Sequence, residues 1–228
     1  KGARSVRSRN ASLCRILSYS NLELHKKNDL YWLMGGSLNN AFFGINSDLE
    51  AFSLASYIAE IADEISGENF PAHEVLQMTL NTLYAIENGL KPLWQIKATY
   101  ELFAANISGF MPDLVTCRDC GKESFDGDLW LDVMNGAIVC PECLSKKNGS
   151  LPVPETDRFE TRNILLPLDA SALAAMRYIA TAPLKRIFAY GLSSKESADY
   201  LCRAAEIYLL NHLERGFDTL TFYHTVTK

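Results

Sequence analysis

Residues 117–143 read CRDCGKESFDGDLWLDVMNGAIVCPEC, a stretch that begins and ends with a C-x2-C pair. The two pairs are separated by 19 residues, which is a spacing typical of four-thiolate zinc sites. Two cysteines three apart on a tight turn can place both sulfurs on one ion, so two such turns complete a tetrahedron. A closed tetrahedron leaves no position for water, and the sequence therefore predicts a structural Zn²⁺ site that does not catalyse. Its predicted ligands are Cys117, Cys120, Cys140 and Cys143.

The residues beside the first cysteine pair favour this interpretation. Gly121 can adopt the left-handed conformation that such a turn requires. The side chains of Arg118 and Lys122 are expected to offset part of the thiolate charge. A thiol oxidoreductase is the weaker alternative, because no β-α-β pattern of the thioredoxin type surrounds either pair.

The composition is that of an ordinary globular protein of one large or two modest domains. The chain has 228 residues, of which 48% are hydrophobic and 21% charged, so it can bury a sizeable core. It contains no apolar run near the ~18 residues that span a bilayer and no signal-peptide pattern. Cys14 and Cys202 lie in apolar sequence and are expected to be reduced core thiols, which indicates the cytoplasm. Because the first residue is Lys1 rather than Met, we expect further residues upstream.

The net charge of −5 is distributed unevenly along the chain. Residues 1–27 carry seven basic side chains against Glu23 alone, whereas the other 201 residues carry 15 basic and 26 acidic side chains. Such asymmetry indicates a surface for nucleic acid or another anionic partner, and Tyr19, Tyr31 and Trp32 could stack against bases there. The alternative is a solvated edge strand whose charges prevent aggregation. The predicted phosphate contacts are Lys1, Arg4, Arg7, Arg9, Arg15, Lys26 and Lys27.

Hydrophobic periodicity and turn residues predict both strands and helices. The pair Gly35-Gly36 is expected to end the third strand, and residues 148–167 are expected to form a loop because they contain three prolines. Strands are predicted over 13–17, 22–25, 30–34, 130–133 and 137–139. Helices are predicted over 49–66, 71–87, 92–107, 169–180 and 195–215, with a short one starting at residue 183.

The sequence contains no pattern that points to an enzyme. It has no G-x-S-x-G, no P-loop, no H-E-x-x-H and no G-x-G-x-x-G. The four histidines are scattered and lack catalytic partners, so each is more simply a surface or core residue. The acidic pair Asp63-Glu64 similarly has no partner that would make it a catalytic site.

The order of these parts resembles that of the bacterial RecO family of recombination mediators. A basic β segment precedes a helical body, a cysteine ribbon follows the third helix, and helices return after it. The run KGARSVRSR at 1–9 looks like a strand of that family's OB-fold, although the family's earlier OB-fold strands are absent here. The other similar runs are SDLE at 47–50, LASY at 54–57, GFMPDL at 109–114 with Cys117 and Cys120, APL at 182–184, HLER at 212–215 and TL at 219–220.

The resemblance spans essentially the whole chain and implies an α+β fold. A truncated N-terminal OB-fold β-barrel would precede a mostly α-helical domain into which a four-cysteine zinc ribbon is inserted. The corresponding divisions are 1–46 for the OB-fold, 47–112 for the first part of the helical domain, 113–147 for the ribbon and 148–228 for the second helical part.

The resemblance also implies a non-enzymatic role in recombinational repair by the RecF pathway, in the bacterial cytoplasm at the nucleoid. Family members bind single- and double-stranded DNA, anneal complementary strands, and join RecR to help load RecA. They also contact the acidic C-terminal tail of single-stranded DNA-binding protein, for which we expect an apolar groove flanked by a basic side chain. The candidates for that side chain are Lys97, Lys185 and Arg186. The competing interpretation is a zinc-ribbon scaffold that binds only protein, with the basic arm serving an acidic partner.

Overall fold

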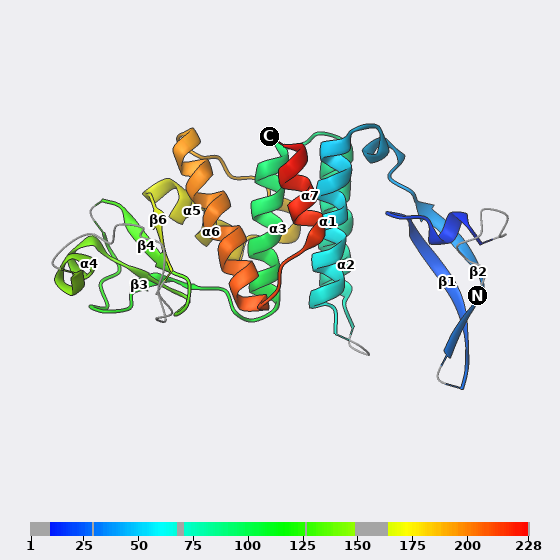
Figure 1. Ribbon diagram of the computed structural model, residues 1–228, viewed down its shortest axis with the longest axis horizontal. Helices are drawn as coiled ribbons and strands as arrows, with labels where there is room; N and C mark the ends of the chain where they lie inside the picture. Colours follow the sequence, from blue (N-terminus) through cyan, green and yellow to red (C-terminus); the bar gives the residue numbers. More distant parts are fainter. Residues whose placement is uncertain (1–9, 29, 68–70, 126, 149–163, 228) are drawn as a thin grey trace. The chain divides into compact units, whose positions relative to one another are not determined.

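The computed structural model describes residues 10–28, 30–67, 71–125, 127–148 and 164–227, and these form an α+β protein (Figure 1). The described residues divide into two compact units, one within 1–90 and 217–228 and the other within 91–216. The helices are α1 (Leu49–Ile65), α2 (His73–Glu87), α3 (Leu93–Ile107), α4 (Pro141–Asn148), α5 (Ala170–Thr181), α6 (Lys195–Leu213) and α7 (Asp218–Val226). The strands are β1 (Tyr19–Lys27), β2 (Leu30–Asn40), β3 (Asp113–Cys117), β4 (Leu129–Asp132), β5 (Ala137–Val139) and β6 (Leu165–Leu168). Short 3₁₀ helices are η1 (Ser12–Cys14), η2 (Phe43–Ser47) and η3 (Leu184–Arg186).

The strands of the first unit form an antiparallel hairpin, β1–β2. The prediction that Gly35 and Gly36 end the strand is wrong, because β2 continues to Asn40. A side chain at Gly36 would place its Cβ 2.1 Å from the carbonyl oxygen of Asn21, so glycine permits the close approach of the two strands there. The predicted strand at 13–17 is also wrong, since η1 and an extended segment occupy it. Among the described residues the hairpin does not close into a barrel, and the OB-fold stays a prediction.

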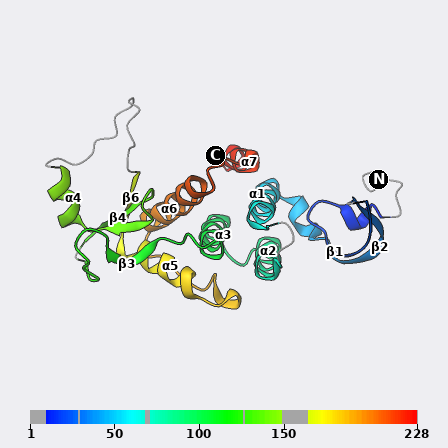
Figure 2. The same cartoon turned by 90° about the horizontal axis from the view of Figure 1, so that it is seen from below.

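The helices of the first unit are α1, α2 and α7. The sequence offers Ser47 or Asp48 as the cap of α1, and Asp48 takes this role by accepting hydrogen bonds from the N–H groups of Glu50 and Ala51. Figure 2 shows α1 and α2 end-on and side by side, and α7 also packs against α1. The edge of the Tyr57 ring meets Phe217 at 5.6 Å between centroids. Residues near the C-terminus therefore complete the helical core of the first unit.

The second unit combines α3, α5 and α6 with a four-stranded sheet of order β3-β5-β4-β6. Strand β3 runs parallel to β5, and β4 is antiparallel to both β5 and β6. Helix α3 is buried without interruption from Gln95 to Ala105, so it is the central helix of this unit. Strand β6 begins inside the segment predicted to be a loop and pairs with β4, so that prediction is wrong for residues 165–167. The sheet carries the cysteines, and β6 leads directly into α5.

Candidate functional site

The first cysteine pair lies on a tight turn at the end of β3. The N–H of Cys117 donates to the carbonyl of Lys122 at 2.9 Å, and the N–H of Gly121 donates to the carbonyl of Cys117 at 2.8 Å. Gly121 has the left-handed φ of +71° that the sequence predicts. The N–H of Arg118 donates to the carbonyl of Ile138 at 3.0 Å, which ties this turn to β5.

The second cysteine pair joins β5 to a helix that the sequence does not predict. Cys140 follows β5 directly, and Cys143 lies in the first turn of α4. The N–H groups of Cys143 and Leu144 both donate to the carbonyl of Cys140, at 3.1 and 3.0 Å. The start of α4 therefore fixes the spacing between the two sulfurs of this pair.

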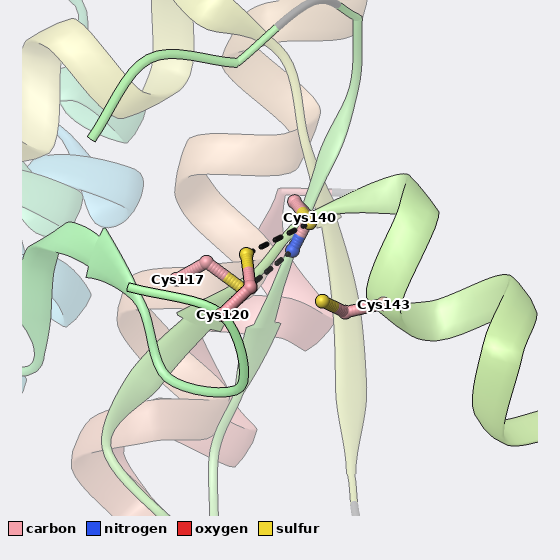
Figure 3. Close-up of side chains that lie close together, drawn as sticks. All are labelled: Cys117, Cys120, Cys140 and Cys143. Carbon is pink, nitrogen blue, oxygen red and sulfur yellow. Dashed lines mark hydrogen bonds between the residues drawn. The ribbon is translucent and has the colours of Figure 1, made fainter. Parts of the chain in front are cut away.

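The four cysteine sulfurs meet between these two turns (Figure 3), and all lie within 4.8 Å of one another. The sulfurs of Cys120 and Cys140 are 3.8 Å apart. A tetrahedron with Zn–S bonds of about 2.3 Å has S···S edges of about 3.8 Å, so the cluster has the size that a zinc ion requires. Cys120 is exposed and the other three cysteines are buried, with Cys117 at 1% exposure. The predicted quartet thus comes together and could hold a metal ion.

The four thiols differ in how easily they ionise. Burial on its own would raise the pKa of Cys117, but N–H groups of Cys140, Asp119 and Cys120 donate to its sulfur and lower the pKa to about 6. Hydrogen bonds with the side chains of Cys120 and Cys140 favour the neutral thiol of Cys143 and raise its pKa to about 12. A metal ion that binds thiolates would displace the proton that Cys143 retains.

The basic side chains near the cluster are already paired with carboxylates. The guanidinium of Arg118 pairs with Asp132, and the ammonium of Lys122 lies 2.7 Å from the carboxylate of Glu142. Their charges are therefore shared with these carboxylates rather than reserved for the sulfurs.

The tip of the β1–β2 hairpin presents basic and aromatic side chains together. Lys26 and Lys27 are exposed, as are Tyr31 at 62% and Trp32 at 42%. The ammonium of Lys26 lies 5.6 Å from the centroid of the Tyr31 ring, directly across the two strands. His25 faces Trp32 in the next register position. An exposed surface of cations and flat rings is suited to phosphates and bases.

Arg15 belongs to the same unit and contacts an aromatic ring that the sequence interpretation missed. Its guanidinium carbon lies 4.8 Å from the ring centroid of Phe43, which is 60% exposed. Tyr19, by contrast, is partly buried. The sequence offered one sign that Phe43 contributes to this surface, namely an aromatic residue soon after a strand of the basic segment. The other predicted phosphate contacts, Lys1, Arg4, Arg7 and Arg9, lie outside the described residues.

The three candidates for tail binding occupy different environments. Lys97 is buried in α3, with its side chain 5% exposed and its ammonium 2.7 Å from Glu101 and 2.6 Å from Glu206. Lys185 and Arg186 are exposed in η3. A partner carboxylate would therefore reach the η3 pair without displacing a buried ion pair.

A groove of about 470 Å³ lies between the first turns of α3 and α6. Trp94, Leu192, Ala198 and Cys202 supply its apolar lining, and Lys195 is its basic lining residue. The groove combines an apolar surface with the cation of Lys195 and the carboxylate of Asp199. An apolar surface beside a cation is the combination expected of a site for an apolar peptide that ends in a carboxylate.

The two cysteines outside the cluster, Cys14 and Cys202, are both predicted to be core thiols, but their exposure differs. Cys14 is exposed, so the prediction that it is a core thiol is wrong; it belongs to η1 at the surface and not to a packed strand. Cys202 is partly buried, and burial raises the pKa of its thiol to about 12, so it remains protonated at neutral pH.

Comparison with known proteins finds a family model and several relatives that this chain resembles. Residues 46–158 match the family model described as "Recombination protein O C terminal". A "DNA repair protein RecO" from Acetivibrio thermocellus is 26% identical over 228 residues, which cover 100% of this chain and 84% of that protein. One from Thermoanaerobacter sp. (strain X514) is 27% identical over 229 residues, with coverage of 99% and 84%. One from Roseiflexus sp. (strain RS-1) is 26% identical over 228 residues, with coverage of 99% and 74%. Among the described residues, no helix has the length and apolar character needed to cross a membrane.

Proposed function

This chain belongs to the RecO family, and from that premise we propose that it is a DNA-binding mediator of recombinational repair. It binds single- and double-stranded DNA and anneals complementary strands. The observation that carries the proposal is the hairpin tip, where exposed lysines on β1 lie beside exposed rings on β2. Phosphates pair with the lysines while bases stack on Tyr31 and Trp32. The wider set of phosphate contacts includes Lys1, Arg4, Arg7, Arg9 and Arg15.

The remaining parts of the proposal follow from the family. Residues 1–46 belong to an OB-fold domain, 47–112 and 148–228 to a helical domain, and 113–147 to a zinc ribbon. The four cysteines hold a structural Zn²⁺ whose closed coordination leaves no catalytic position, so the role is non-enzymatic. The protein acts in the bacterial cytoplasm at the nucleoid, where it joins RecR and helps to load RecA.

Reversing the charge of the hairpin tip tests the DNA-binding surface. The double substitution Lys26→Glu with Lys27→Glu should weaken binding of a single-stranded oligonucleotide by about 10- to 100-fold at ~50 mM salt. Because two phosphate contacts are lost, the plot of log affinity against log salt should become less steep by about 1.4. Fluorescence anisotropy titrations at several salt concentrations measure both quantities.

The matched control for that experiment is Lys185→Glu with Arg186→Glu, which makes the same charge change at an exposed basic pair outside the hairpin. It should leave the affinity within about twofold of the wild type. Equal losses in the two double variants would assign the effect to net charge alone. A wild-type protein that binds no DNA at low salt would favour the protein-only scaffold.

We also propose that the groove between α3 and α6 receives the C-terminal tail of single-stranded DNA-binding protein. Lys195 supplies a cation beside the apolar lining, whereas Lys97 is occupied by two carboxylates. Lys195→Glu should weaken binding of a fluorescent tail peptide by about tenfold, the effect of losing a charge-assisted hydrogen bond.

Lys185→Glu makes the same charge change at an exposed lysine in the same unit. A peptide affinity that falls with Lys195→Glu and not with Lys185→Glu supports the groove. The reverse result would place the tail at η3, beside Lys185 and Arg186.

A further inference from the structure

We propose that the ion pair between Arg118 and Asp132 positions the first cysteine turn for metal binding. The inference rests on the proposed zinc site, to which it adds a specific residue outside the ligand set. Asp132 is the last residue of β4 and is 1% exposed, so its carboxylate is held inside the ribbon. Arg118 lies between the two ligands Cys117 and Cys120 in the sequence.

The carboxylate of Asp132 is fully engaged by donors from two segments. One oxygen, Oδ2, accepts from the guanidinium of Arg118. The other, Oδ1, accepts from the backbone N–H of Asn135 at 3.1 Å and from the Asn135 side-chain amide at 2.9 Å. A buried carboxylate with three donors has a fixed orientation, and it fixes the guanidinium in turn.

Arg118 attaches the cysteine turn to the sheet at two points. Its backbone N–H donates to the carbonyl of Ile138 on β5, and its side chain reaches Asp132 on β4. Cys117 is the last residue of β3 and the backbone bond joins Arg118 to β5, so the backbone holds the start of the turn to these two strands. The side-chain ion pair adds a tie to a third strand, β4, so the sulfurs of Cys117 and Cys120 are aimed toward the second pair before a metal arrives. Ligands that are held in place lose less conformational freedom on binding an ion.

A second ion pair, between Lys122 and Glu142, offers an internal comparison. It also joins the two halves of the site, because Lys122 follows the first cysteine pair and Glu142 lies within the second. Its side chains are 53% and 63% exposed, against 23% and 2% for Arg118 and Asp132. An exposed pair contributes little, since water and salt screen it. The ion pair between Arg118 and Asp132 should therefore affect zinc binding more than the pair between Lys122 and Glu142 does.

Asp132→Asn and Glu142→Gln test the inference as a matched pair, because each removes one negative charge and keeps the shape of the side chain. Asp132→Asn should weaken zinc binding by about 10- to 100-fold, the usual effect of losing a partner that orients a ligand. Glu142→Gln should weaken it by about twofold. Competition of the full chain with a chromophoric chelator measures the zinc affinity.

Arg118→Gln separates positioning from a loss of stability. It should match the loss caused by Asp132→Asn, and the double variant should be no weaker than either single variant, since both break the contact between Arg118 and Asp132. The other side-chain contact of Arg118, with Asp119 at 3.4 Å, joins neighbouring residues of the same turn and does not reach the sheet. With Co²⁺ in place of Zn²⁺, the visible d–d bands of the two variants should broaden and shift, which reports a loosened tetrahedron. A variant that was merely less stable would bind less Co²⁺ with unchanged bands.

Each outcome of these experiments either supports or overturns the inference. Equal affinities of Asp132→Asn and Glu142→Gln would overturn it while leaving the zinc site intact, and so would additive losses in the double variant. A wild-type chain that binds no zinc would overturn the proposed metal site, and the inference with it. If Asp132→Asn does not fold, Arg118→Gln carries the comparison, because its side chain reaches the surface.

Discussion

Cys117→Ser is expected to abolish stoichiometric zinc binding and to unfold the sheet β3-β5-β4-β6. The sulfur of Cys117 is buried at the end of β3 and accepts the N–H of Cys140 at 3.4 Å, so a shorter, harder oxygen cannot replace it. Structural zinc sites have apparent binding free energies of about 10–16 kcal/mol, as large as the whole stability of a typical domain. Zinc content per chain and amide hydrogen exchange over β4 and β5 measure the two effects. Cys14→Ser is the control, because it changes an exposed cysteine outside the cluster.

The same variant distinguishes a structural metal from one that contacts DNA. Helices α1, α2 and α7 belong to the other compact unit and should keep their protection from exchange. Binding of single-stranded DNA should be retained within about twofold, since the proposed contacts lie on the β1–β2 hairpin. If DNA binding disappeared together with the zinc, the ribbon would have to be part of the nucleic-acid interface. A Cys117→Ser chain that still held one zinc would contradict the four-thiolate assignment.

The features that the sequence predicts correctly are those determined by residues that are close together in the chain. The cysteine cluster follows from spacing, because a tetrahedral ion demands two pairs of sulfurs on two tight turns. The starts of three helices follow from residue types that cap helices: Asp48, Asp169 and Ser194 each accept a backbone N–H in the first turn, and the sequence offers Ser47 and Ser193 equally for the first and the last of them. Such features depend on residues close together in the sequence.

The elements that the sequence does not predict depend on distant partners. Strand β6 contains Pro167 and lies at the edge of the sheet, where a missing N–H is tolerated, but only the pairing with β4 reveals it. Helix α7 follows Gly216, just after the end of the predicted helix 195–215, and is stabilised by packing against α1. The continuation of β2 through Gly36 similarly requires the approach of Asn21 on the other strand.

The environment of Lys97 also depends on residues distant in the sequence, so the sequence did not predict it. A lone lysine in the sequence indicates a surface cation, yet α3 is the central helix of its unit and buries the side chain. A signal was present: Lys97 and Glu101 are the only charged residues in α3, four positions apart, among apolar neighbours. Two opposite charges on one turn of an otherwise apolar helix indicate a buried pair more than a binding surface.

Lys97→Met is expected to lower the free energy of unfolding by about 3–5 kcal/mol, because it leaves the fully buried carboxylate of Glu101 without its cation. Chemical denaturation followed by circular dichroism measures the loss. Lys185→Met removes the same charge from an exposed lysine and should cost under about 0.5 kcal/mol. A second substitution, Glu101→Met, should recover most of the stability of Lys97→Met, since it removes the uncompensated charge as well.

The pH dependence gives an independent check on this ion pair. Burial alone would lower the pKa of Lys97, but Glu101 and Glu206 outweigh it and raise the pKa above its ordinary value. A lysine whose pKa is higher in the folded state stabilises the fold fully below its unfolded pKa and loses that contribution only as the pH rises through the folded value. The difference in stability between wild type and Lys97→Met should therefore persist from about pH 6 to pH 9 and shrink only in strong alkali. It should be smaller at the acid end of this range, because the unpaired Glu101 of the variant can take up a proton there. A difference that vanished near neutral pH would mean that Lys97 is uncharged in the folded protein, and the buried ion pair would be wrong.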